Sequence, residues 1–392
     1  MKISLVVSDL SKSGVGRWGG AVRPFLLSQA LRQLGHSVEI LGFNREVSAP
    51  TRSQIDGIPI AAWPARPYPP FLTSARQLLQ HLDGDLIYAY KLKATSFGLA
   101  LLHRRLRGRP VLLDIDDWEL GLHGGENFAY RPSPRQLARD LLKANGALRN
   151  PDHPLYLQWA EGWVAQADAV TTHTQFMQAR FGGVYLPNGK DVHRFDPDRY
   201  DAQASRDRYG LAGYRVLMFP GAPRPYKGIE DVLVALDQLD IPDLRLVIVG
   251  GSPYDDYDEQ LRSRWGRWIV QLPPVPAEQM PEVVAAAHVV VVPQRNHPNA
   301  LAQFPLKLTD GMAMAKPILA TTVGDIPQIL GEAGYLVPPS APNQIAATLQ
   351  TIFGEWEGAL ARGQQARRRC VEHYSVEVMA DILAQLLARW QS

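Results

Sequence analysis

Two cationic side chains lie in one short segment and have the chemistry to hold a diphosphate. In GAPRPYKGIEDVLVAL (221–236), Arg224 and Lys227 are three residues apart, between an apolar run and a helical pattern that begins near Gly228. A helix N-terminus favours negative charge, and arginine and lysine bind phosphate oxygens through charge-assisted hydrogen bonds. We predict a diphosphate-binding loop here, and the alternative is a pair of solvated surface charges.

A second segment, FPLKLTDGMAMAKPILAT (304–321), places a lysine and a carboxylate on one face of a helix. Asp310 follows Lys307 by three residues, which is the spacing of neighbours on a helix surface. Asp310 could accept hydrogen bonds from ribose hydroxyls, while Lys307 and the amides around Leu306 bind a phosphate. A surface salt bridge is the alternative.

Carboxylates also follow an apolar run in the first half of the chain. An Asp-x-Asp pattern after a strand, here Asp114 and Asp116, can bind a divalent ion that bridges a nucleotide diphosphate. The alternative is that these carboxylates hold helix N-termini or an acceptor hydroxyl. In the polar, aromatic loop that follows, Asp116, Asp117 and His123 are the candidates for contacting an acceptor. Because no other carboxylate or histidine motif completes a metal site, we expect no metal.

A glycine-rich stretch, GVGRWG (14–19), matches the dinucleotide-binding pattern G-x-G-x-x-G, with Glu39 at the expected distance. That pattern needs its glycines directly after the first strand. Here SDLSKS separates them from Val7, and Glu39 lies inside a strand pattern. We therefore favour an anion-binding loop that ends in Gly19-Gly20 at the start of a helix. A plain flexible loop is the alternative.

Two successions of strands and helices must position these residues. Short β-branched runs alternate with helical patterns such as 21–34, where apolar residues recur at helical spacing. In the first succession the predicted strands are 2–7, 37–41, 85–90, 111–115 and 168–173. After a segment rich in Pro, Gly, Asn and Asp, the predicted strands are 214–221, 244–251, 268–274, 288–293, 316–322 and 334–339.

This alternation predicts the α/β class, with doubly wound parallel sheets that are covered on both faces. We predict an N-terminal domain at 1–187, a C-terminal domain at 191–370, and a terminal helix at 371–392 that packs back on the first domain. Ligands of such sheets bind outside the carboxyl ends of the strands. Two facing halves would therefore form a cleft between them.

The composition excludes several classes of protein. The chain has 392 residues, 46% hydrophobic and 20% charged, and its formal net charge of +2 argues against a nucleic-acid binder. Its one cysteine, Cys370, excludes an internal disulfide framework. Without a signal-peptide or membrane-spanning pattern, we expect a cytoplasmic protein. The basic clusters 103–109 and 366–369 are solvated faces or, for a lipid-linked acceptor, contacts with anionic lipids at the inner face of a membrane.

The segments GAPRPYKG (221–228) and DGMAMAKPILAT (310–321) resemble the donor-domain motifs of the family-4 retaining glycosyltransferases, which have the GT-B fold. Those motifs are a G-x-x-x-P-x-K-G-like loop and an E-x7-E segment that runs into an E-A-M-A-x-G-K-P-like helix. Supporting matches follow in order along nearly the whole chain: Gly19-Gly20, LRQLGHSVEIL (31–41), ADAV (167–170), LPNGKD (186–191), LVIVGG (246–251) and VGDIPQIL…GYLVPP (323–339). The resemblance implies two Rossmann-like domains that face each other across a cleft.

Three positions depart from the family pattern. Asp310 stands where the family has the second Glu, and Ala302 stands where it has the first Glu, which usually contacts the donor sugar. Gln303 or a residue of QRNHPN (294–299) is the candidate replacement. The histidine that often follows an N-terminal strand maps onto Asp116.

The resemblance implies a retaining, metal-independent hexosyltransferase that uses a UDP- or GDP-sugar and a hydroxyl acceptor, such as a glycan, a lipid-linked sugar or a small metabolite. In that interpretation Arg224 and Lys227 hold the leaving diphosphate and Gly19-Gly20 closes over the same phosphates. Val275 lies in a loop that supplies backbone contacts to the base.

Three other functions stay open on the sequence alone. One is a metal-dependent transferase built around Asp114 and Asp116, and a second is a nicotinamide oxidoreductase. The third is a nucleotide- or sugar-binding protein of the same fold that has lost catalysis. The alanine at position 302, where the family has a glutamate, is the reason to retain this alternative.

Overall fold

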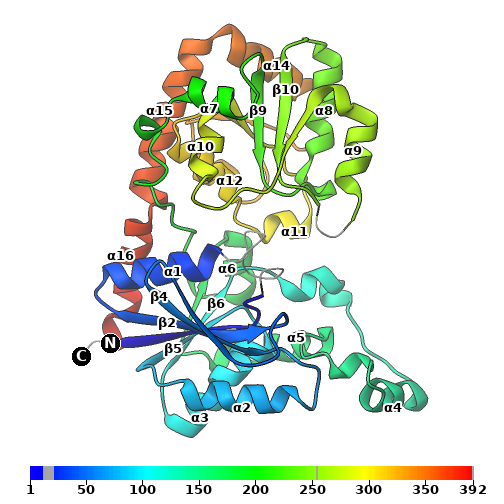
Figure 1. The fold of residues 1–392 in the computed structure, drawn as a ribbon, viewed down its shortest axis with the longest axis vertical. Coiled ribbons are helices and arrows are strands. Elements are labelled where there is room, and N and C mark those ends of the chain that lie inside the picture. The colour runs from blue at the N-terminus through cyan, green and yellow to red at the C-terminus, as the bar shows by residue number, and fades with distance from the viewer. Residues whose placement is uncertain (12–21, 253–254, 391–392) are drawn as a thin grey trace. The chain divides into compact units, whose positions relative to one another are not determined.

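A computed structural model describes residues 1–11, 22–252 and 255–390 of the chain (Figure 1). The chain divides into two compact units, Met1–Pro187 with Met379–Ser392, and Asn188–Val378. Each unit contains its own sheet with helices packed against it. In the described residues, no helix is long and apolar enough to cross a membrane.

The first unit is built on an eight-stranded sheet in the order β3-β4-β2-β1-β5-β6-β7-β8. Its strands are β1 (Lys2–Val7), β2 (Ser37–Asn44), β3 (Thr51–Ile55), β4 (Ile58–Pro64), β5 (Leu86–Tyr90), β6 (Val111–Ile115), β7 (Ala169–Thr172) and β8 (Val184–Tyr185). All neighbours are parallel except β3 and β4, which are antiparallel. The five strands predicted from the sequence are present, and β3, β4 and β8 are additional.

Helices cover both faces of this sheet, with α1 on one side and α2 and α3 on the other (Figure 1). The helices of the unit are α1 (Val22–Gln33), α2 (Phe71–His81), α3 (Leu99–Arg107), α4 (Pro134–Leu142), α5 (Pro154–Glu161), α6 (Gln175–Phe181) and most of α16 (Val376–Leu387). All residues of β5 and β6 are buried because both faces of these strands are covered.

The second unit is built on a fully parallel six-stranded sheet in the order β11-β10-β9-β12-β13-β14. Its strands are β9 (Arg215–Pro220), β10 (Leu244–Val249), β11 (Ile269–Leu272), β12 (Val289–Val292), β13 (Ile318–Thr321) and β14 (Tyr335–Val337), and all six match predicted runs. Its helices include α7 (Ala202–Arg208), α8 (Ile229–Leu239), α9 (Tyr257–Trp265), α11 (Pro298–Leu301), α12 (Leu306–Ala313), α14 (Pro342–Gly354) and α15 (Trp356–Tyr374).

Alternating residues of β12 enter two separate cores of the second unit. Val290 and Val292 pack in one apolar cluster with Met312, whereas Val289 and Val291 pack in the other with Leu236. Because successive side chains of a strand point to opposite faces, an unbroken valine run is what a sheet covered on both faces requires. The predicted doubly wound α/β class is confirmed in both units.

The strand orders determine where each unit can bind a ligand. In the second sheet the order reverses between β9 and β12, and in the first sheet it reverses between β1 and β5. Ligands of open α/β sheets bind beyond the carboxyl ends of the strands at this reversal. The loops that follow β9 and β12, and those that follow β1 and β5, are therefore the places to look for a site.

Candidate functional sites at the carboxyl edges of the two sheets

The loop between β9 and α8 carries the two cations that the sequence singled out. Arg224 precedes a short 3-10 helix, Pro225–Lys227, which leads into α8. The Lys227 Nζ donates to the carbonyl oxygen of Ala222 at 2.9 Å, and the Arg224 guanidinium lies 3.0 Å from a carboxylate oxygen of Asp255. The structure thus places both side chains in one loop at the point where the strand order of the sheet reverses.

Gly228 lets this loop pass against the loop that follows β12. Its φ is 69°, in the left-handed region, and a Cβ built there would lie 1.8 Å from the carbonyl oxygen of Pro293. Only glycine fits this position, because any side chain would both strain the backbone and collide with a main-chain atom. The glycine thereby allows the loop that carries Lys227 to lie against the loop after β12.

Arg295, in the loop after β12, holds the first turn of α8 in place, and the sequence reasoning did not single it out. Its guanidinium donates to both carboxylate oxygens of Asp231, at 2.9 and 2.7 Å, and lies 2.9 Å from Glu230. Its backbone N–H donates to the carbonyl oxygen of Tyr226 at 2.9 Å. These bonds, with Asp231 foremost, raise the pKa of Arg295, so it stays charged. Arg295 thus ties together the two loops at the reversal of the strand order.

Lys307 and Asp310 are both buried on α12, each with 8% of its surface exposed, so the alternative of a surface salt bridge is wrong. The Asp310 carboxylate pairs with Lys190, in the segment before α7. The Lys307 Nζ instead lies 4.7 Å from the centre of the Phe219 ring. Burial lowers the pKa of Lys307 to about 8, and Asp310 opposes that effect only in part. Through this pairing Lys190 joins the candidate site, and the sequence reasoning did not single it out.

Ala302 is buried ahead of α12, and two residues near it in the chain, Gln303 and His297, contact Tyr226. The Tyr226 hydroxyl donates to Gln303 at 3.4 Å, and its ring stacks on His297 with 5.7 Å between ring centres. Ala302 follows α11 and is 2% exposed. The two candidate replacements, Gln303 and a residue of 294–299, therefore converge on the loop that holds Lys227. Leu306 and Val275 pack their side chains against an apolar core. The Leu306 carbonyl oxygen accepts a hydrogen bond from the Thr309 hydroxyl at 3.0 Å.

In the first unit, Asp114 is fully buried and engaged with other side chains. The Arg23 guanidinium donates to both of its oxygens, at 2.6 and 2.7 Å, and the Thr171 hydroxyl donates at 2.6 Å. Arg23 lies in the first turn of α1, so this ion pair fixes the start of α1 on β6. The structure therefore assigns Asp114 to an ion pair, and the described residues contain no group of three or more side chains able to hold a metal ion.

Lys91, directly after β5, forms ion pairs with the carboxylates that follow β6. Its φ is 71°, which is unusual for a residue other than glycine. Its Nζ lies 2.8 Å from Asp117, 2.7 Å from Glu119 and 3.7 Å from Asp116. Burial alone would raise the pKa of Glu119, but the charges of Lys91 and Lys93 hold it at about 2. A strained backbone that places a cation among carboxylates is typical of a functional site.

Asp116 has a different environment from its neighbours. It is 6% exposed, its Oδ2 accepts a hydrogen bond from Tyr90, and its Oδ1 is buried without a hydrogen-bond partner. Burial raises the pKa of this carboxyl to about 7, with Lys91 opposing the shift. Near neutral pH the acid form can therefore donate, and the ionised form accept, a hydrogen bond. Asp116 and Asp117 lie together, whereas His123 is exposed at the end of the 3-10 helix Glu119–His123.

The glycine-rich stretch, with Gly19 and Gly20, lies outside the described residues. Glu39, the carboxylate that a dinucleotide site would use, lies inside β2, as expected. It accepts a hydrogen bond from the Ser4 hydroxyl at 2.6 Å and pairs with Lys2 at 3.1 Å. It is therefore engaged inside the sheet and does not lie at its carboxyl edge.

The two basic clusters differ in how their side chains are used. In 366–369, Arg367 donates to the carbonyl oxygen of Phe195 at 2.8 Å, and Arg369 donates to those of Ile329 and Gln328 at 2.7 Å. These bonds hold α15 against the rest of the second unit, so the two arginines are engaged within the protein. The cluster 103–109 lies on and after α3, where Leu106 and the preceding Leu102 are exposed by 65% and 42%.

Comparison with known families matches both halves of the chain. Residues 19–194 match a family model described as "Glycosyl transferase 4-like domain", and residues 214–355 match one described as "Glycosyl transferases group 1". Both matched regions contain the side-chain clusters described above.

Two curated relatives are similar to the chain in sequence. The chain is 28% identical over 238 residues to a GDP-mannose-dependent alpha-(1-6)-phosphatidylinositol monomannoside mannosyltransferase of Mycolicibacterium smegmatis, covering 57% of this chain and 62% of that relative. It is 25% identical over 416 residues to a D-inositol 3-phosphate glycosyltransferase of Corynebacterium glutamicum, covering 98% of this chain and 94% of that relative.

Solved structures are similar over the full length. Sucrose-phosphate synthase from Thermosynechococcus elongatus superposes with a TM-score of 0.72 at 19% identity, covering 100% of this chain and 99% of that one. HepE from Anabaena, solved in complex with UDP-glucose, superposes with a TM-score of 0.73 at 17% identity, covering 99% and 100%. At these identities the likeness is one of fold.

Proposed function

Because the chain belongs to the glycosyl transferases group 1 family and is a glycosyltransferase of the GT-B fold, we propose that it moves a sugar from a UDP- or GDP-sugar to a hydroxyl acceptor. We propose further that the anomeric configuration is retained and that no metal ion takes part. The names of a GDP-mannose-dependent relative and of a structural neighbour bound to UDP-glucose support a nucleotide-sugar donor.

The observation that carries this proposal is that Arg224 and Lys227 both lie in the one loop ahead of α8. Transfer from a nucleotide sugar requires charge that stabilises the departing diphosphate. A preorganised cation aimed at such a leaving group contributes about 3 kcal/mol to the transition state. Two fixed cations next to a helix N-terminus can carry this charge without a metal ion.

Lys307, Asp310 and Lys190 complete the donor site in this proposal. Burial lowers the pKa of Lys307 to about 8, and a phosphate beside it would favour the charged form and so bind more tightly. Asp310 accepts from the ribose hydroxyls, and Lys190 acts as a positioning residue because it pairs with that carboxylate.

The acceptor site in this proposal is the cluster around Asp116. The Asp116 Oδ1, which has no hydrogen-bond partner and lies 3.7 Å from the Lys91 Nζ, exchanges a hydrogen bond with the acceptor hydroxyl, while Lys91 holds Asp117 beside it. The acceptor oxygen attacks the anomeric carbon from the face of the leaving phosphate. As the bond between the anomeric carbon and the leaving phosphate oxygen breaks, the proton of the acceptor hydroxyl passes to a phosphate oxygen. The acceptor is a glycan, a lipid-linked sugar or a small metabolite, reached in the cytoplasm or at the inner face of a membrane.

A thermal-shift panel with UDP, GDP, ADP and NAD, each with and without EDTA, tests the donor and the metal together. A ligand at 100 times its dissociation constant adds about 2.7 kcal/mol of stability. We expect stabilisation by UDP or GDP that survives EDTA. Stabilisation by NAD alone, or its loss with EDTA, would contradict the proposal.

Replacing Lys227 with alanine tests the loop itself. We expect Lys227→Ala to lower donor turnover by roughly 100-fold, the effect of losing one preorganised donor, without changing the fold. The matched control is Arg262→Ala, which removes an exposed cation from α9. A variant that turns over donor like the parent protein would sink the assignment. A parent protein that binds donor but shows neither hydrolysis nor transfer would favour the alternative of a protein without catalysis.

A further inference from the structure

Helix α4 of the first unit has almost all of its side chains exposed. Asp140 is its one buried residue, and that carboxylate accepts a hydrogen bond from the Tyr130 hydroxyl at 2.8 Å. Three leucines of the same helix face outward, with Leu137 exposed by 39%, Leu141 by 51% and Leu142 by 80%. Soluble proteins rarely leave such residues together on a surface unless the surface binds something.

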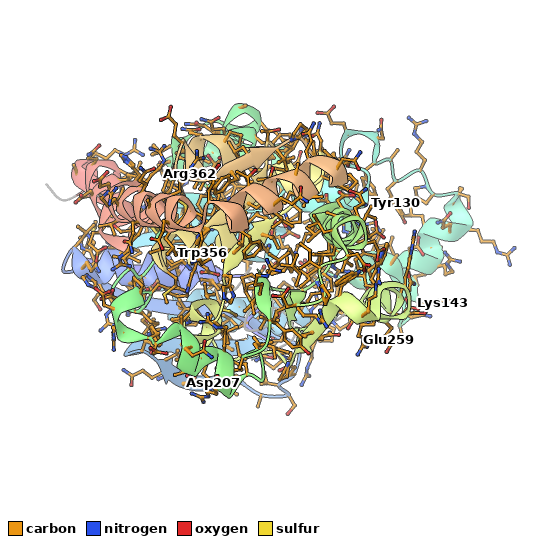
Figure 2. The ribbon with its side chains drawn as sticks, turned by 90° about the horizontal axis from the view of Figure 1, so that it is seen from above. Tyr130, Lys143, Asp207, Glu259, Trp356 and Arg362 are labelled. Carbon is orange, nitrogen blue, oxygen red and sulfur yellow. The ribbon has the colours of Figure 1, made fainter. Side chains whose placement is uncertain are left out.

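The charges around these leucines have one sign. Between residues 131 and 143 the exposed side chains include Arg131, Arg135, Arg139 and Lys143, and Asp140 is the one acidic residue. At helical spacing, Arg135, Arg139 and Lys143 lie along one side of the helix. Leu137 and Leu141 lie along the opposite side, and Leu142 lies next to the cations. Figure 2 labels Tyr130 and Lys143, which bound this segment. The segment thus joins an apolar face to a positive one.

Aromatic rings continue the surface from α4 to α5. The Tyr130 ring contacts His153, with 5.1 Å between ring centres, and Tyr156 follows at 6.0 Å from His153. Trp159 lies 5.4 Å beyond Tyr156 and is exposed by 50%. Tryptophan and tyrosine are favoured where an apolar phase meets water.

We propose that α4, with Trp159 of α5, docks the protein on an anionic phospholipid surface. Leucines that reach the acyl boundary and cations at the level of the lipid phosphates are the features of an interfacial helix. Charge complementarity selects this occupant over a neutral glycan. The inference rests on the proposed function in one respect, because it places a lipid-linked acceptor within reach of the first unit.

The other basic surfaces match this pattern less well. In 366–369, Arg367 and Arg369 are engaged with backbone carbonyl groups, as described above. Helix α3 also exposes Leu102 and Leu106, but its opposite face buries apolar residues such as Leu99 and Leu101, as a surface helix normally does. Helix α3 is therefore the rival surface, and the experiment includes it.

Co-sedimentation of the full chain with vesicles tests the proposal. The vesicles consist of phosphatidylcholine alone or of phosphatidylcholine with phosphatidylglycerol. We expect binding to the second kind only, weakened by added salt because the charges are exposed. Arg135→Ser with Lys143→Ser should weaken binding about fivefold for each cation removed. Leu141→Ser with Leu142→Ser should weaken it roughly tenfold or more, with the melting temperature unchanged.

Leu102→Ser with Leu106→Ser on α3 is the matched control and should leave vesicle binding unchanged. Absence of binding to anionic vesicles, or loss of binding in the α3 variant alone, would overturn the proposal. So would a dimer in solution that the α4 leucine variant converts to a monomer, since the face would then bind a second copy. Vesicle binding is read without donor or acceptor, so its failure is distinct from a failure of the proposed transferase.

Discussion

Gly228 is the residue at which the backbone of the donor loop has the least freedom. Its φ is left-handed, and the Pro293 carbonyl oxygen lies 1.8 Å from the position that a Cβ would take, so any side chain is excluded. We predict that Gly228→Ala lowers the free energy of unfolding by roughly 2–5 kcal/mol, the sum of backbone strain and overpacking. Urea unfolding measures this loss.

The matched control is Gly358→Ala. Gly358 lies on α15, is exposed, and has no atom within 4 Å of the position that a Cβ would take. Because alanine favours helix more than glycine does, this variant should be unchanged or up to about 1 kcal/mol more stable. Equal effects of the two substitutions would show that the close approach at Gly228 does not constrain the loop.

Asp116 should make stability depend on pH. Burial raises the pKa of its carboxyl to about 7, whereas an unfolded aspartate titrates near 3.9. Between about pH 4 and pH 7 the folded state therefore binds more protons at this site, so the contribution of Asp116 to stability falls as the pH rises. Above about pH 7 the loss is complete.

We therefore expect Asp116→Asn to gain stability over the parent protein as the pH rises through this window, with the difference reaching a plateau above about pH 7. Urea unfolding midpoints at a series of pH values measure the difference. Asp207→Asn, on the exposed side of α7 (Figure 2), controls for removing a carboxylate. A constant difference across the window would contradict the role of burial at Asp116.

At the residue scale, the sequence could predict side chains whose chemistry is explicit but not those that position them. Arg224 and Lys227 are recognisable because two cations precede a helix pattern. Lys190 lies in a segment that reads as a turn, and its pairing with Asp310 spans 120 positions. The left-handed backbone of Lys91 could not be predicted either, because glycine is the residue that usually indicates this conformation and position 91 is a lysine.

At the scale of elements, burial decided which strands the sequence could predict. Strands such as β6 and β12 are buried throughout and appear as continuous apolar runs. Strand β3 is exposed at all of its residues, because it lies at the edge of the first sheet and pairs only with β4. Its sequence, TRSQI, therefore has no apolar pattern that could indicate a strand.

The helices α4 and α12 should differ widely in local stability. One of the nine residues of α4 is buried, against seven of the eight of α12. Segments with few buried contacts open locally far more often than core segments. We predict that the backbone amides of α4 exchange with deuterium at least about 100-fold faster than those of α12, after correction for intrinsic rates. Similar protection of both helices would contradict this expectation.

At the scale of the molecule, two units with separate cores should unfold as more than one cooperative unit. The calorimetric enthalpy should then exceed the van't Hoff enthalpy. Asp114→Asn, which leaves Arg23 buried without its ion pair, should destabilise the first unit by about 3–5 kcal/mol. Gly228→Ala should instead lower the transition of the second unit.

Scanning calorimetry of the two variants assigns the transitions. UDP or GDP, if bound as proposed, should raise the transition that Gly228→Ala lowers. A single transition that both substitutions shift equally would show that the two units unfold together.

The one cysteine of the chain has a practical consequence. Cys370 is fully buried on α15, its thiol lies 3.8 Å from the Thr309 carbonyl oxygen, and burial raises its pKa to about 12. Thiol-directed dyes react with exposed thiolates, so they should spare this side chain. Cysteines introduced by Arg105→Cys on α3 and Glu259→Cys on α9 would then be the labelled positions, one in each unit. Energy transfer between the two dyes would report how the separation of the units responds to nucleotide, in a chain that keeps its natural thiol.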